Sequence, residues 1–229
     1  MKLNSRLKTI SELVPKESVV ADIGTDHAYL PVYLIKNKIA KRVIAADINI
    51  GPLNNAEKTI NNYGMEKYIE TRLGNGLRAI KPGEIDTAII AGMGGLLIRD
   101  ILRESKEVVD TIKTFIFQPM IAQDELRKWF CKNNFKIDNE RLAKEGNKFY
   151  EILVVSRGEM TIKDSIYYEV GMKLIENNDP YIKEFVDLKL KKYSEILKNV
   201  EEENSIKAKE KYLECKIKIK KLKEVKKCL

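Results

Sequence analysis

Strand-like and helix-like segments alternate over the first 158 residues of this 229-residue chain. Short apolar runs rich in β-branched residues predict seven strands, at Ser18–Ile23, Arg42–Asp47, Tyr68–Leu73, Ile85–Ala91, Thr114–Phe117, Phe135–Arg141 and Phe149–Ser156. Helical patterns separate most of them, at Leu30–Lys38, Pro52–Tyr63, Leu96–Glu104 and Ala122–Asn133. Continuous apolar runs are typical of strands buried inside a parallel sheet. The alternation predicts a doubly wound α/β fold with right-handed crossovers.

The last two predicted strands lie close together in sequence, around Gly146–Asn147. Two strands joined by so short a connection form an antiparallel hairpin, which we expect at one edge of the sheet. A plain dinucleotide-binding fold has no reason to end in this way. A seven-stranded, Rossmann-like sheet with an antiparallel hairpin is typical of class I methyltransferases, and this is the fold class that we predict for residues 1–158.

The pattern becomes entirely helical after Gly158. Apolar residues then recur at steps of three and four in two segments separated by the polar, acidic stretch Asn199–Ser205. The first seam contains Val186, Leu190, Tyr193, Leu197 and Val200, and the second contains Tyr212, Cys215, Ile219, Leu222, Lys226 and Leu229. Two such seams joined by a short turn predict an antiparallel coiled coil, so we assign residues 159–229 to a helical domain. Its alternative role is a solvated hairpin that only caps or dimerises.

The positive charge of the chain is concentrated in this tail. The formal charge is +8, and residues 205–229 contain ten lysines against three glutamates. A basic helical segment favours a polyanionic partner such as RNA. No apolar run of about 18 residues predicts a membrane span, and the polar N-terminus predicts no signal peptide. Three separated cysteines give neither a thiolate metal site nor a disulfide framework, so we expect a cytoplasmic protein without metal.

The first predicted strand runs into Asp22-Ile23-Gly24-Thr25-Asp26-His27-Ala28. A glycine at a strand end lets the backbone approach a ligand closely. Dinucleotide-binding folds use the spacing G-x-G-x-x-G to make room for a pyrophosphate, whereas here Asp26 and Ala28 replace the later glycines. A carboxylate repels a pyrophosphate but attracts the sulfonium and ammonium groups of S-adenosylmethionine. The charge pattern therefore favours S-adenosylmethionine over NAD.

The next three strand ends also carry ligand-binding patterns. Asp47 closes the second strand, where an acid can accept hydrogen bonds from two ribose hydroxyls, although NAD enzymes share this spacing. The third strand ends in Gly74-Asn75-Gly76, which can present an amide to an adenine edge or form an ordinary turn. The fourth ends in Ala91-Gly92-Met93-Gly94-Gly95, a loop beside the expected crevice that is otherwise a tight strand-to-helix turn.

At these segments the chain resembles the bacterial tRNA (adenine-22)-N1-methyltransferases. The resemblance also covers Arg6-Leu7, Gln118-Pro119-Met120 and Leu126-Arg127-Lys128-Trp129, and in architecture it includes the helical tail. It implies a class I methyltransferase fold, S-adenosylmethionine as donor and a structured tRNA as substrate. The implied cofactor pocket, with its immediate neighbours, comprises Asp22, Gly24, Thr25, Asp47, Ile48, Asn75, Gly76, Gly92 and Met93.

Transfer to N1 of adenine needs no general base, because that nitrogen has an in-plane lone pair at neutral pH. Positioning dominates such a reaction and is worth up to about 7–11 kcal/mol in well-oriented systems. Our candidate catalytic residues are Asp26, His27 and Tyr29. Asp26 supplies negative potential or accepts a hydrogen bond from the adenine amino group, His27 orients the base or contacts a phosphate, and Tyr29 stacks on the base or forms a hydrogen bond with it. Both rings also have structural interpretations. His27 can be a structural residue whose hydrogen bonds are all formed within the protein, and Tyr29 can pack in the core at the start of a helix. No Asn/Asp-Pro-Pro-Tyr/Phe motif follows the fourth strand, which favours a ring nitrogen over an exocyclic amine.

Three other functions remain open from the sequence. They are a methyltransferase for another RNA, a protein or a small molecule, an NAD-linked oxidoreductase, and a non-catalytic RNA-binding scaffold. S-Adenosylhomocysteine is expected to raise the melting temperature of any methyltransferase, NADH that of a dehydrogenase, and neither that of a scaffold. A monomer is the favoured oligomeric state.

Overall fold

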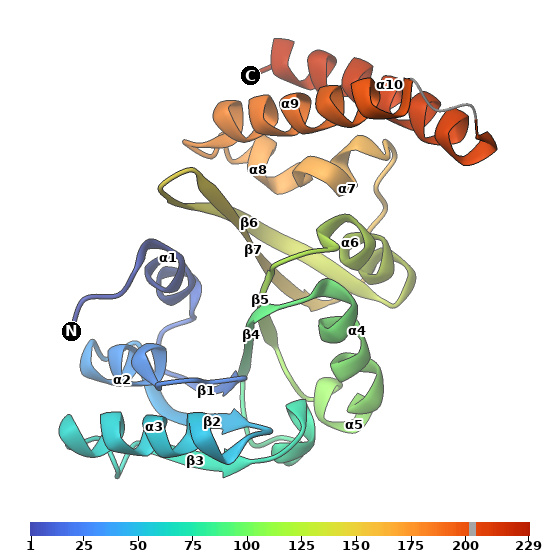
Figure 1. Cartoon of the computed structure of the whole chain (residues 1–229). Coiled ribbons are helices and arrows are strands. Elements are labelled where there is room, and N and C mark those ends of the chain that lie inside the picture. Colours follow the sequence, from blue (N-terminus) through green and yellow to red (C-terminus); the bar gives the residue numbers. More distant parts are fainter. Residues whose placement is uncertain (202–204) are drawn as a thin grey trace. The chain divides into compact units, whose positions relative to one another are not determined.

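The computed structural model describes residues 1–201 and 205–229, which divide into two compact units, Met1–Thr161 and Ile162–Leu229 (Figure 1). The strands of the first unit are β1 (Ser18–Ile23), β2 (Ala40–Asp47), β3 (Ile69–Leu73), β4 (Thr87–Met93), β5 (Thr114–Pro119), β6 (Phe135–Glu145) and β7 (Lys148–Arg157). Its helices are α1 (Ser5–Leu13), α2 (Tyr29–Lys36), α3 (Ile50–Asn62), the 3-10 turn η1 (Gly76–Ala79), α4 (Gly95–Glu104), α5 (Lys106–Val109) and α6 (Gln123–Lys132).

All seven strands form one sheet in the order β3-β2-β1-β4-β5-β7-β6. β1 to β5 are parallel, whereas β7 runs antiparallel to both β5 and β6. The sequence order of the strands reverses between β1 and β4, which are direct neighbours. Open α/β sheets bind ligands outside the carboxyl ends of the strands at such a switch point. The sheet thus confirms the predicted fold, and the switch point predicts a ligand-binding crevice beyond Ile23 and Met93, the last residues of β1 and β4.

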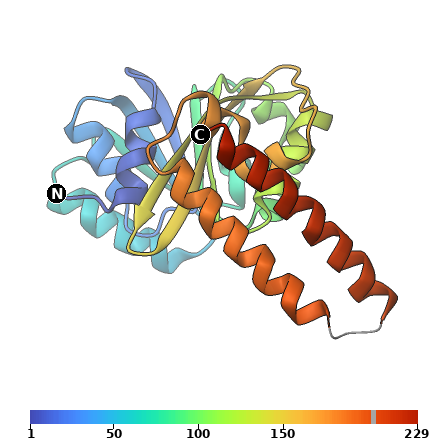
Figure 2. The same cartoon turned by 90° about the horizontal axis from the view of Figure 1, so that it is seen from above.

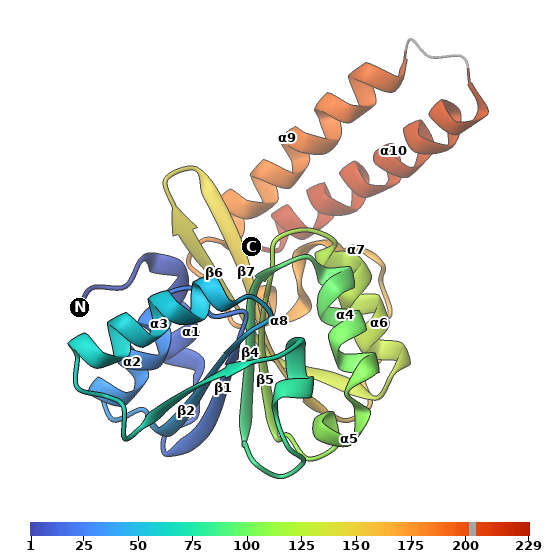
Figure 3. The same ribbon diagram turned by 60° about the horizontal axis from the view of Figure 1, so that its bottom comes forward.

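Helices cover both faces of the sheet, with α1, α2 and α3 on one face and α4, α5 and α6 on the other (Figure 3). Alternate strand residues face the two layers, as the pleat requires. Val43 and Ala45 of β2 pack with the first set of helices, while Ile44 and Ala46 pack with the second. Because both faces are buried, the strands are almost continuously apolar.

The predicted segments are confirmed, and their ends differ from the structure by at most four residues. Two differences have a local backbone cause. Lys38 has φ 55° and Ala122 has φ 57°, values outside the right-handed helical region, so α2 ends before Lys38 and α6 begins after Ala122. The short elements η1 and α5 were not predicted, because four residues are too few to show a helical period.

A buried group of three charges fastens α6 to the β6–β7 hairpin. The Arg127 side chain is fully buried, and its guanidinium contacts Glu140 and Glu151 at 2.7 Å each. Both carboxylates are almost completely buried as well. Charges removed from water require partners of this kind, so the three side chains fix the position of the helix on the hairpin.

The second unit contains α7 (Ile166–Val170), α8 (Met172–Glu176), α9 (Ile182–Glu201) and α10 (Ile206–Lys227). α9 and α10 run antiparallel, side by side, as predicted (Figure 2). Helix α9 continues into the predicted polar break as far as Glu201, and so includes Val200, which was also predicted as a seam residue. Residues 202–204 of that break lie outside the described residues. The short helices α7 and α8 were not predicted.

One seam position in α10 was predicted wrongly. Val225 is buried, whereas Lys226 is exposed and pairs with Asp187 of α9. The step of three residues from Leu222 to Val225 keeps an apolar side chain in the interface, and it leaves the lysine at its edge.

Within residues 1–201 and 205–229, no helix is both long enough and apolar enough to cross a membrane. The same residues contain no group of three or more histidine, cysteine, aspartate or glutamate side chains arranged to hold a metal ion.

Candidate active site

A pocket of about 250 Å³ opens where β1 ends and α2 begins. Its lining includes six of the residues predicted for the site, namely Asp22, Gly24, Thr25, Asp26, His27 and Tyr29. The remaining predicted residues, Asp47, Ile48, Asn75, Gly76, Gly92 and Met93, do not line this pocket. They lie at the carboxyl ends of the strands beside it, in or directly after β2, β3 and β4.

The Asp22 carboxylate is the buried charge of this pocket. Asp22 is 8% exposed, and burial raises the pKa of its carboxyl group from 3.8 to about 6. A hydrogen bond with the Thr25 side chain and the positive charge of Arg6 lower the pKa, while the charge of Asp47 adds to the rise. Because an ionised carboxylate is costly in such surroundings, a cation bound beside Asp22 is favoured.

The backbone after β1 is shaped by Gly24. Its φ is +81°, a value that side chains rarely allow, and its N–H donates to the Ala46 carbonyl at 2.8 Å. A Cβ atom added at Gly24 would lie 2.3 Å from Cε of Met93. The positive φ therefore favours glycine at this turn, whereas the end of the flexible Met93 side chain could move away from a Cβ atom.

Asp26, His27 and Tyr29 form a contiguous group on the outer wall of the pocket. Nε2 of His27 lies 3.4 Å from Oδ2 of Asp26, and the rings of His27 and Tyr29 are stacked with centroids 5.1 Å apart. Tyr29 is 45% exposed, so its ring is not the packed core residue that its alternative interpretation required. An acid beside a stacked pair of rings suits a planar ligand that becomes cationic.

Asp47 holds together the turns after β2 and β3. Its carboxylate accepts a hydrogen bond from the Asn49 N–H at 2.7 Å, and its carbonyl accepts one from the Gly74 N–H at 2.9 Å. Ile48 and Asn75 are both exposed beside it. Asp47, Ile48 and Asn75 thus lie on adjoining turns and offer an acid, an apolar side chain and an amide to a ligand.

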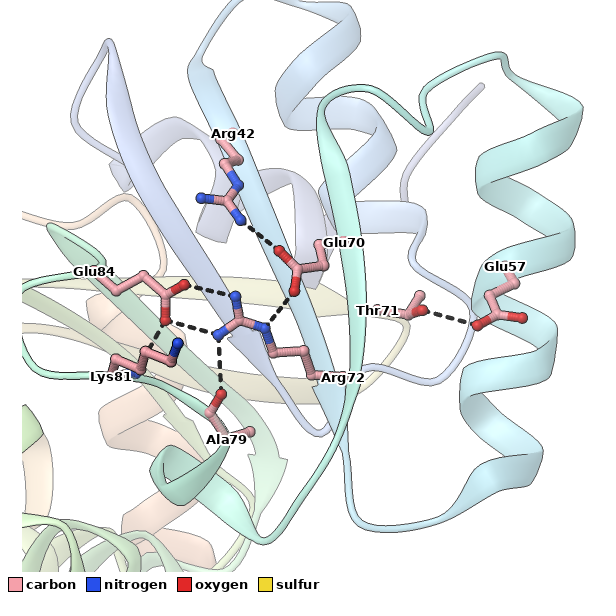
Figure 4. Close-up of polar contacts among 8 residues, drawn as sticks. All are labelled: Arg42, Glu57, Glu70, Thr71, Arg72, Ala79, Lys81 and Glu84. Carbon is pink, nitrogen blue, oxygen red and sulfur yellow. Dashed lines mark hydrogen bonds and ion pairs between the residues drawn. The ribbon is translucent and has the colours of Figure 1, made fainter.

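The loop that carries Asn75 is fixed by Arg72 of β3 (Figure 4). The guanidinium donates two hydrogen bonds to Glu84, at 2.6 and 2.7 Å, and one to Glu70 at 2.7 Å. It also donates to the Ala79 carbonyl at the end of η1, at 3.1 Å. Hydrogen bonds from Arg72 lower the pKa of Glu84 to about 2. Arg72 therefore ties both ends of the Gly74–Ala79 loop to the sheet.

Replacing Arg72 with methionine is expected to loosen this loop. We expect the free energy of unfolding to fall by about 1–3 kcal/mol and the affinity for the methyl donor to fall about three- to tenfold. The stability difference is expected above about pH 4.5 and to vanish as the pH falls towards 2, because the pKa of Glu84 is lowered only in the folded protein. Denaturation at several pH values and donor calorimetry measure both effects.

Arg42→Met is the matched control, because Arg42 also pairs with Glu70 but its side chain is 45% exposed (Figure 4). Surface pairs contribute about 1 kcal/mol or less, so this variant is expected to retain donor affinity. Equal losses in the two variants would contradict a special role for Arg72 in holding the loop.

Large apolar side chains are exposed around the carboxyl edge of the sheet. In the first unit, eight of the ten exposed large apolar residues lie at or after the ends of β1 to β5, and the other two are Tyr63 and Tyr68. The eight are Tyr29, Ile48, Ile50, Leu73, Leu96, Leu97, Met120 and Ile121, which we call the apolar rim. Exposed apolar surface gathered beside a pocket marks a binding surface.

The part of the rim after β4 and β5 is held by backbone contacts. The Gly95 N–H donates to the Ile121 carbonyl at 2.9 Å, and the Met120 N–H donates to the Met93 carbonyl at 2.8 Å. A Cβ atom at Gly95 would lie 2.5 Å from the Ala122 carbonyl oxygen. The glycines after β4 therefore serve close packing of two loops, in addition to flexibility at the crevice.

The structure adds Arg6 and Gln118 to the candidate site. Arg6 lines the pocket from α1, and its guanidinium donates to Oε1 of the fully buried Gln118 at 2.8 Å. The backbone N–H of Arg6 donates to Glu145 at 2.9 Å, which fixes the helix to β6. Sequence reasoning noted both residues as family landmarks without assigning either a role, because contacts across more than 100 residues leave no local signal.

Comparisons with known proteins agree with this geometry. Residues 3–153 match the sequence model of a family described as "Methyltransferase domain". The chain is 36% identical to the tRNA (adenine(22)-N(1))-methyltransferase of Bacillus subtilis, over 88% of this chain and 84% of that protein. The crystal structure of the B. subtilis m1A22 tRNA methyltransferase TrmK matches with a TM-score of 0.88 and 34% identity, over 98% and 99% of the two chains. TrmK of M. capricolum in complex with S-adenosyl-homocysteine matches with a TM-score of 0.84 and 30% identity, over 100% and 99%.

Proposed function

The chain belongs to the tRNA (adenine-22)-N1-methyltransferase family, and from that premise we propose how its carboxyl-edge site works. The enzyme transfers a methyl group from S-adenosylmethionine to N1 of adenine 22 in tRNA. The observation that carries the assignment to this site is the buried Asp22 carboxylate beside Gly24, an arrangement that suits a cationic ligand and disfavours a pyrophosphate.

The pocket residues fit the donor in charge and in shape. Bound S-adenosylmethionine supplies an electrophilic methyl group on a positively charged sulfur. We assign the cationic end of the donor to Asp22, its ribose to Asp47 and its adenine to Asn75 and Ile48. Gly24, Thr25, Gly76, Gly92 and Met93 complete the proposed pocket through backbone and packing contacts, and Arg6 offers a positive charge to the donor carboxylate.

The acceptor base requires positioning more than proton transfer. N1 of adenine is unprotonated at neutral pH, so the side chains have to align it with the donor methyl group. The stacked His27 and Tyr29 rings offer a flat surface for the base, and the apolar rim offers contacts to bases displaced around it. Asp26 provides negative potential where the methylated ring becomes cationic.

Asp26→Ala is expected to lower the turnover number about ten- to a hundredfold while leaving donor affinity unchanged. The reason is that the Asp26 carboxylate stabilises charge that develops only in the acceptor. Single-turnover methylation of tRNA and calorimetry with S-adenosylhomocysteine measure the two quantities. Asp138→Ala, at an exposed acid of β6, is the control. Full turnover by Asp26→Ala with unchanged tRNA affinity would remove Asp26 from the mechanism.

We further propose that the helical tail holds tRNA through its phosphates. Ten lysines against three glutamates in residues 205–229 support this role. Replacing the exposed lysines Lys209, Lys216, Lys220 and Lys223 with glutamine is expected to weaken tRNA binding and to reduce the slope of log K against log salt by about 0.7–0.9 per lost contact. Donor affinity is expected to stay unchanged.

The control for the tail carries four substitutions on exposed lysines of the first unit, Lys16, Lys38, Lys58 and Lys67. Equal tRNA affinity of the tail variant and the wild-type protein would reduce the tail to a structural role.

We also propose that the protein acts as a monomer in the cytoplasm. Sedimentation at enzyme-assay concentrations tests this oligomeric state.

The decisive test of the function is mass spectrometry of tRNA incubated with the enzyme and isotopically labelled donor. We expect one labelled methyl group at N1 of adenine 22, and no label after adenine 22 is replaced by guanine. Label on another base, on an exocyclic amine or on protein would overturn the assignment.

A further inference from the structure

A second pocket, of about 460 Å³, lies at the opposite edge of the sheet from the active site. Its walls come from the end of α4, from α5, from the end of α6, and from the start of β6 and the end of β7. Because β7 is antiparallel to β5, its last residue lies near the amino end of β5. A strand rises about 3.3 Å per residue, so the six residues of β5 separate this pocket from the active site by roughly 20 Å.

The pocket combines an apolar interior with a cationic rim. Leu102, Val109, Trp129 and Phe135 provide apolar surface, and Arg103, Lys106, Lys132 and Arg157 provide positive charge. Asp110 is the single carboxylate in the lining, where it pairs with Lys106 and lies 3.4 Å from Arg157. Arg103 in addition lies 3.6 Å from Asp100, which is outside the lining. Four cations against these two acids leave the rim attractive to an anion.

Arg157 is held in place before any ligand binds. Its guanidinium lies 4.6 Å from the centre of the Phe135 ring and donates to the Asn133 carbonyl at 3.1 Å. Since its side chain is only 35% exposed, part of the ordering cost has been met within the folded protein. A preorganised guanidinium with lysines beside it is suited to a phosphate group.

The remaining walls select for a planar group attached to that phosphate. Trp129 is partly buried and packs against Phe130 and Phe135, which leaves part of the indole at the pocket surface. The volume falls in the range of small-ligand sites, of about 300–1,000 Å³. A nucleotide has both features, since its phosphate is anionic and its base stacks on aromatic rings.

We propose that this pocket binds a nucleotide of the tRNA remote from adenine 22, with Lys132 and Arg157 on the phosphate and Trp129 beside the base. The tRNA source of the ligand rests on the proposed function, whereas the nucleotide chemistry of the pocket does not. At roughly 20 Å from the active site, bound nucleotide acts as an anchor for the substrate and takes no part in methyl transfer.

The full chain contains one tryptophan, so intrinsic tryptophan fluorescence reports on this pocket alone. We would titrate the full-length protein with adenosine monophosphate, inorganic phosphate and tRNA, with excitation at the red edge of the indole band. Saturable quenching by tRNA is expected, with weaker quenching by adenosine monophosphate. Inorganic phosphate is expected to compete with the nucleotide while quenching little itself.

Lys132→Met is expected to weaken nucleotide and tRNA binding about three- to tenfold and to leave S-adenosylhomocysteine affinity unchanged. Arg157→Met is the second variant, and near-ultraviolet circular dichroism checks that the aromatic cluster remains intact. Lys58→Met, on the exposed surface of α3, is the control and is expected to bind as the wild type does.

Quenching by adenosine monophosphate without any effect of Lys132→Met on tRNA affinity would overturn the tRNA source. Absence of saturable quenching by every ligand, or quenching that both variants leave unchanged, would overturn the site itself. Failure of wild-type protein to methylate adenine 22 would overturn the proposed function and, with it, the tRNA source of the ligand. It would leave the nucleotide chemistry of the pocket standing, since the nucleotide titration does not depend on methylation.

Discussion

Asp22→Asn is expected to weaken donor binding at least a hundredfold and, at the same time, to raise the melting temperature of the ligand-free protein. Burial raises the pKa of Asp22 to about 6, so the folded protein holds its proton more tightly than the unfolded chain does. The stability contributed by this group is therefore present below about pH 4 and is lost as the pH rises through 6. At neutral pH the ionised carboxylate is a cost, on the order of 1–3 kcal/mol, which asparagine removes.

The same carboxylate is expected to give donor binding a defined pH dependence. The wild-type affinity is expected to fall about tenfold per pH unit below pH 6, because a bound cation favours the ionised form and protonation competes with it. The affinity of Asp22→Asn, where measurable, is expected to be flat over this range. Calorimetry with S-adenosylhomocysteine, which retains the ammonium group of the donor, and scanning calorimetry of the free protein measure the two effects.

Asp86→Asn is the matched control, because the pKa of Asp86 is lowered by a hydrogen bond from the Val19 N–H and by Lys113. This variant is expected to lower the melting temperature and to leave donor affinity intact, the reverse of Asp22→Asn on both measures. Donor binding by Asp22→Asn at wild-type affinity would contradict the role that we give to Asp22.

Arg127→Met is expected to lower the free energy of unfolding by about 3–5 kcal/mol. This is the largest loss of stability that we expect from a single substitution of a buried residue. The variant leaves two buried carboxylates, Glu140 and Glu151, without the guanidinium that lies 2.7 Å from each. Urea denaturation of the full chain, followed by far-ultraviolet circular dichroism, measures the change in the transition of the first unit.

A triple variant distinguishes the loss of an attractive contact from the cost of leaving two buried acids without the Arg127 guanidinium. Arg127→Met combined with Glu140→Gln and Glu151→Leu removes all three charges and is expected to recover most of the lost stability. Arg127→Lys keeps the charge without the forked geometry and is expected to be intermediate. A single Arg127→Met variant as stable as the wild type would show that the buried charges do not fix α6 to the hairpin.

The alternation of apolar strands and helices was sufficient to predict the sheet and most of its helices. The reason is that both faces of the sheet are covered, so each strand is marked by a continuous apolar run and each helix by a one-sided pattern. The strand ends then placed Asp22, Asp47, Asn75 and Gly92 at a common edge, because parallel strands finish at the same side of a sheet.

Contacts between distant segments could not be predicted in this way. The hydrogen bond between Arg6 and Gln118 joins α1 to β5. The sequence around each residue contains no pattern from which its partner could be predicted. Arg127 lies in a helix whose other charged residues are exposed or half-buried, so its complete burial follows only from the position of β6 and β7. Tertiary structure decides such cases, as it decided between Val225 and Lys226 in α10.

Gly95 lies in close contact with the carbonyl groups of Ile121 and Ala122. Because of this contact, substitutions at position 95 and substitutions at the exposed side chains beside it are expected to have different consequences. The frame of the two loops depends on main-chain atoms and on one missing side chain, so position 95 admits almost no substitution. The side chains of Leu96, Leu97, Met120 and Ile121 are exposed beside that frame, and of these Met120 also accepts a hydrogen bond from Nε2 of Gln118 at 3.4 Å. We therefore expect substitutions at these four positions, in nature or in the laboratory, to be the easiest way to change the methyl acceptor. Such substitutions leave the proposed donor pocket unchanged.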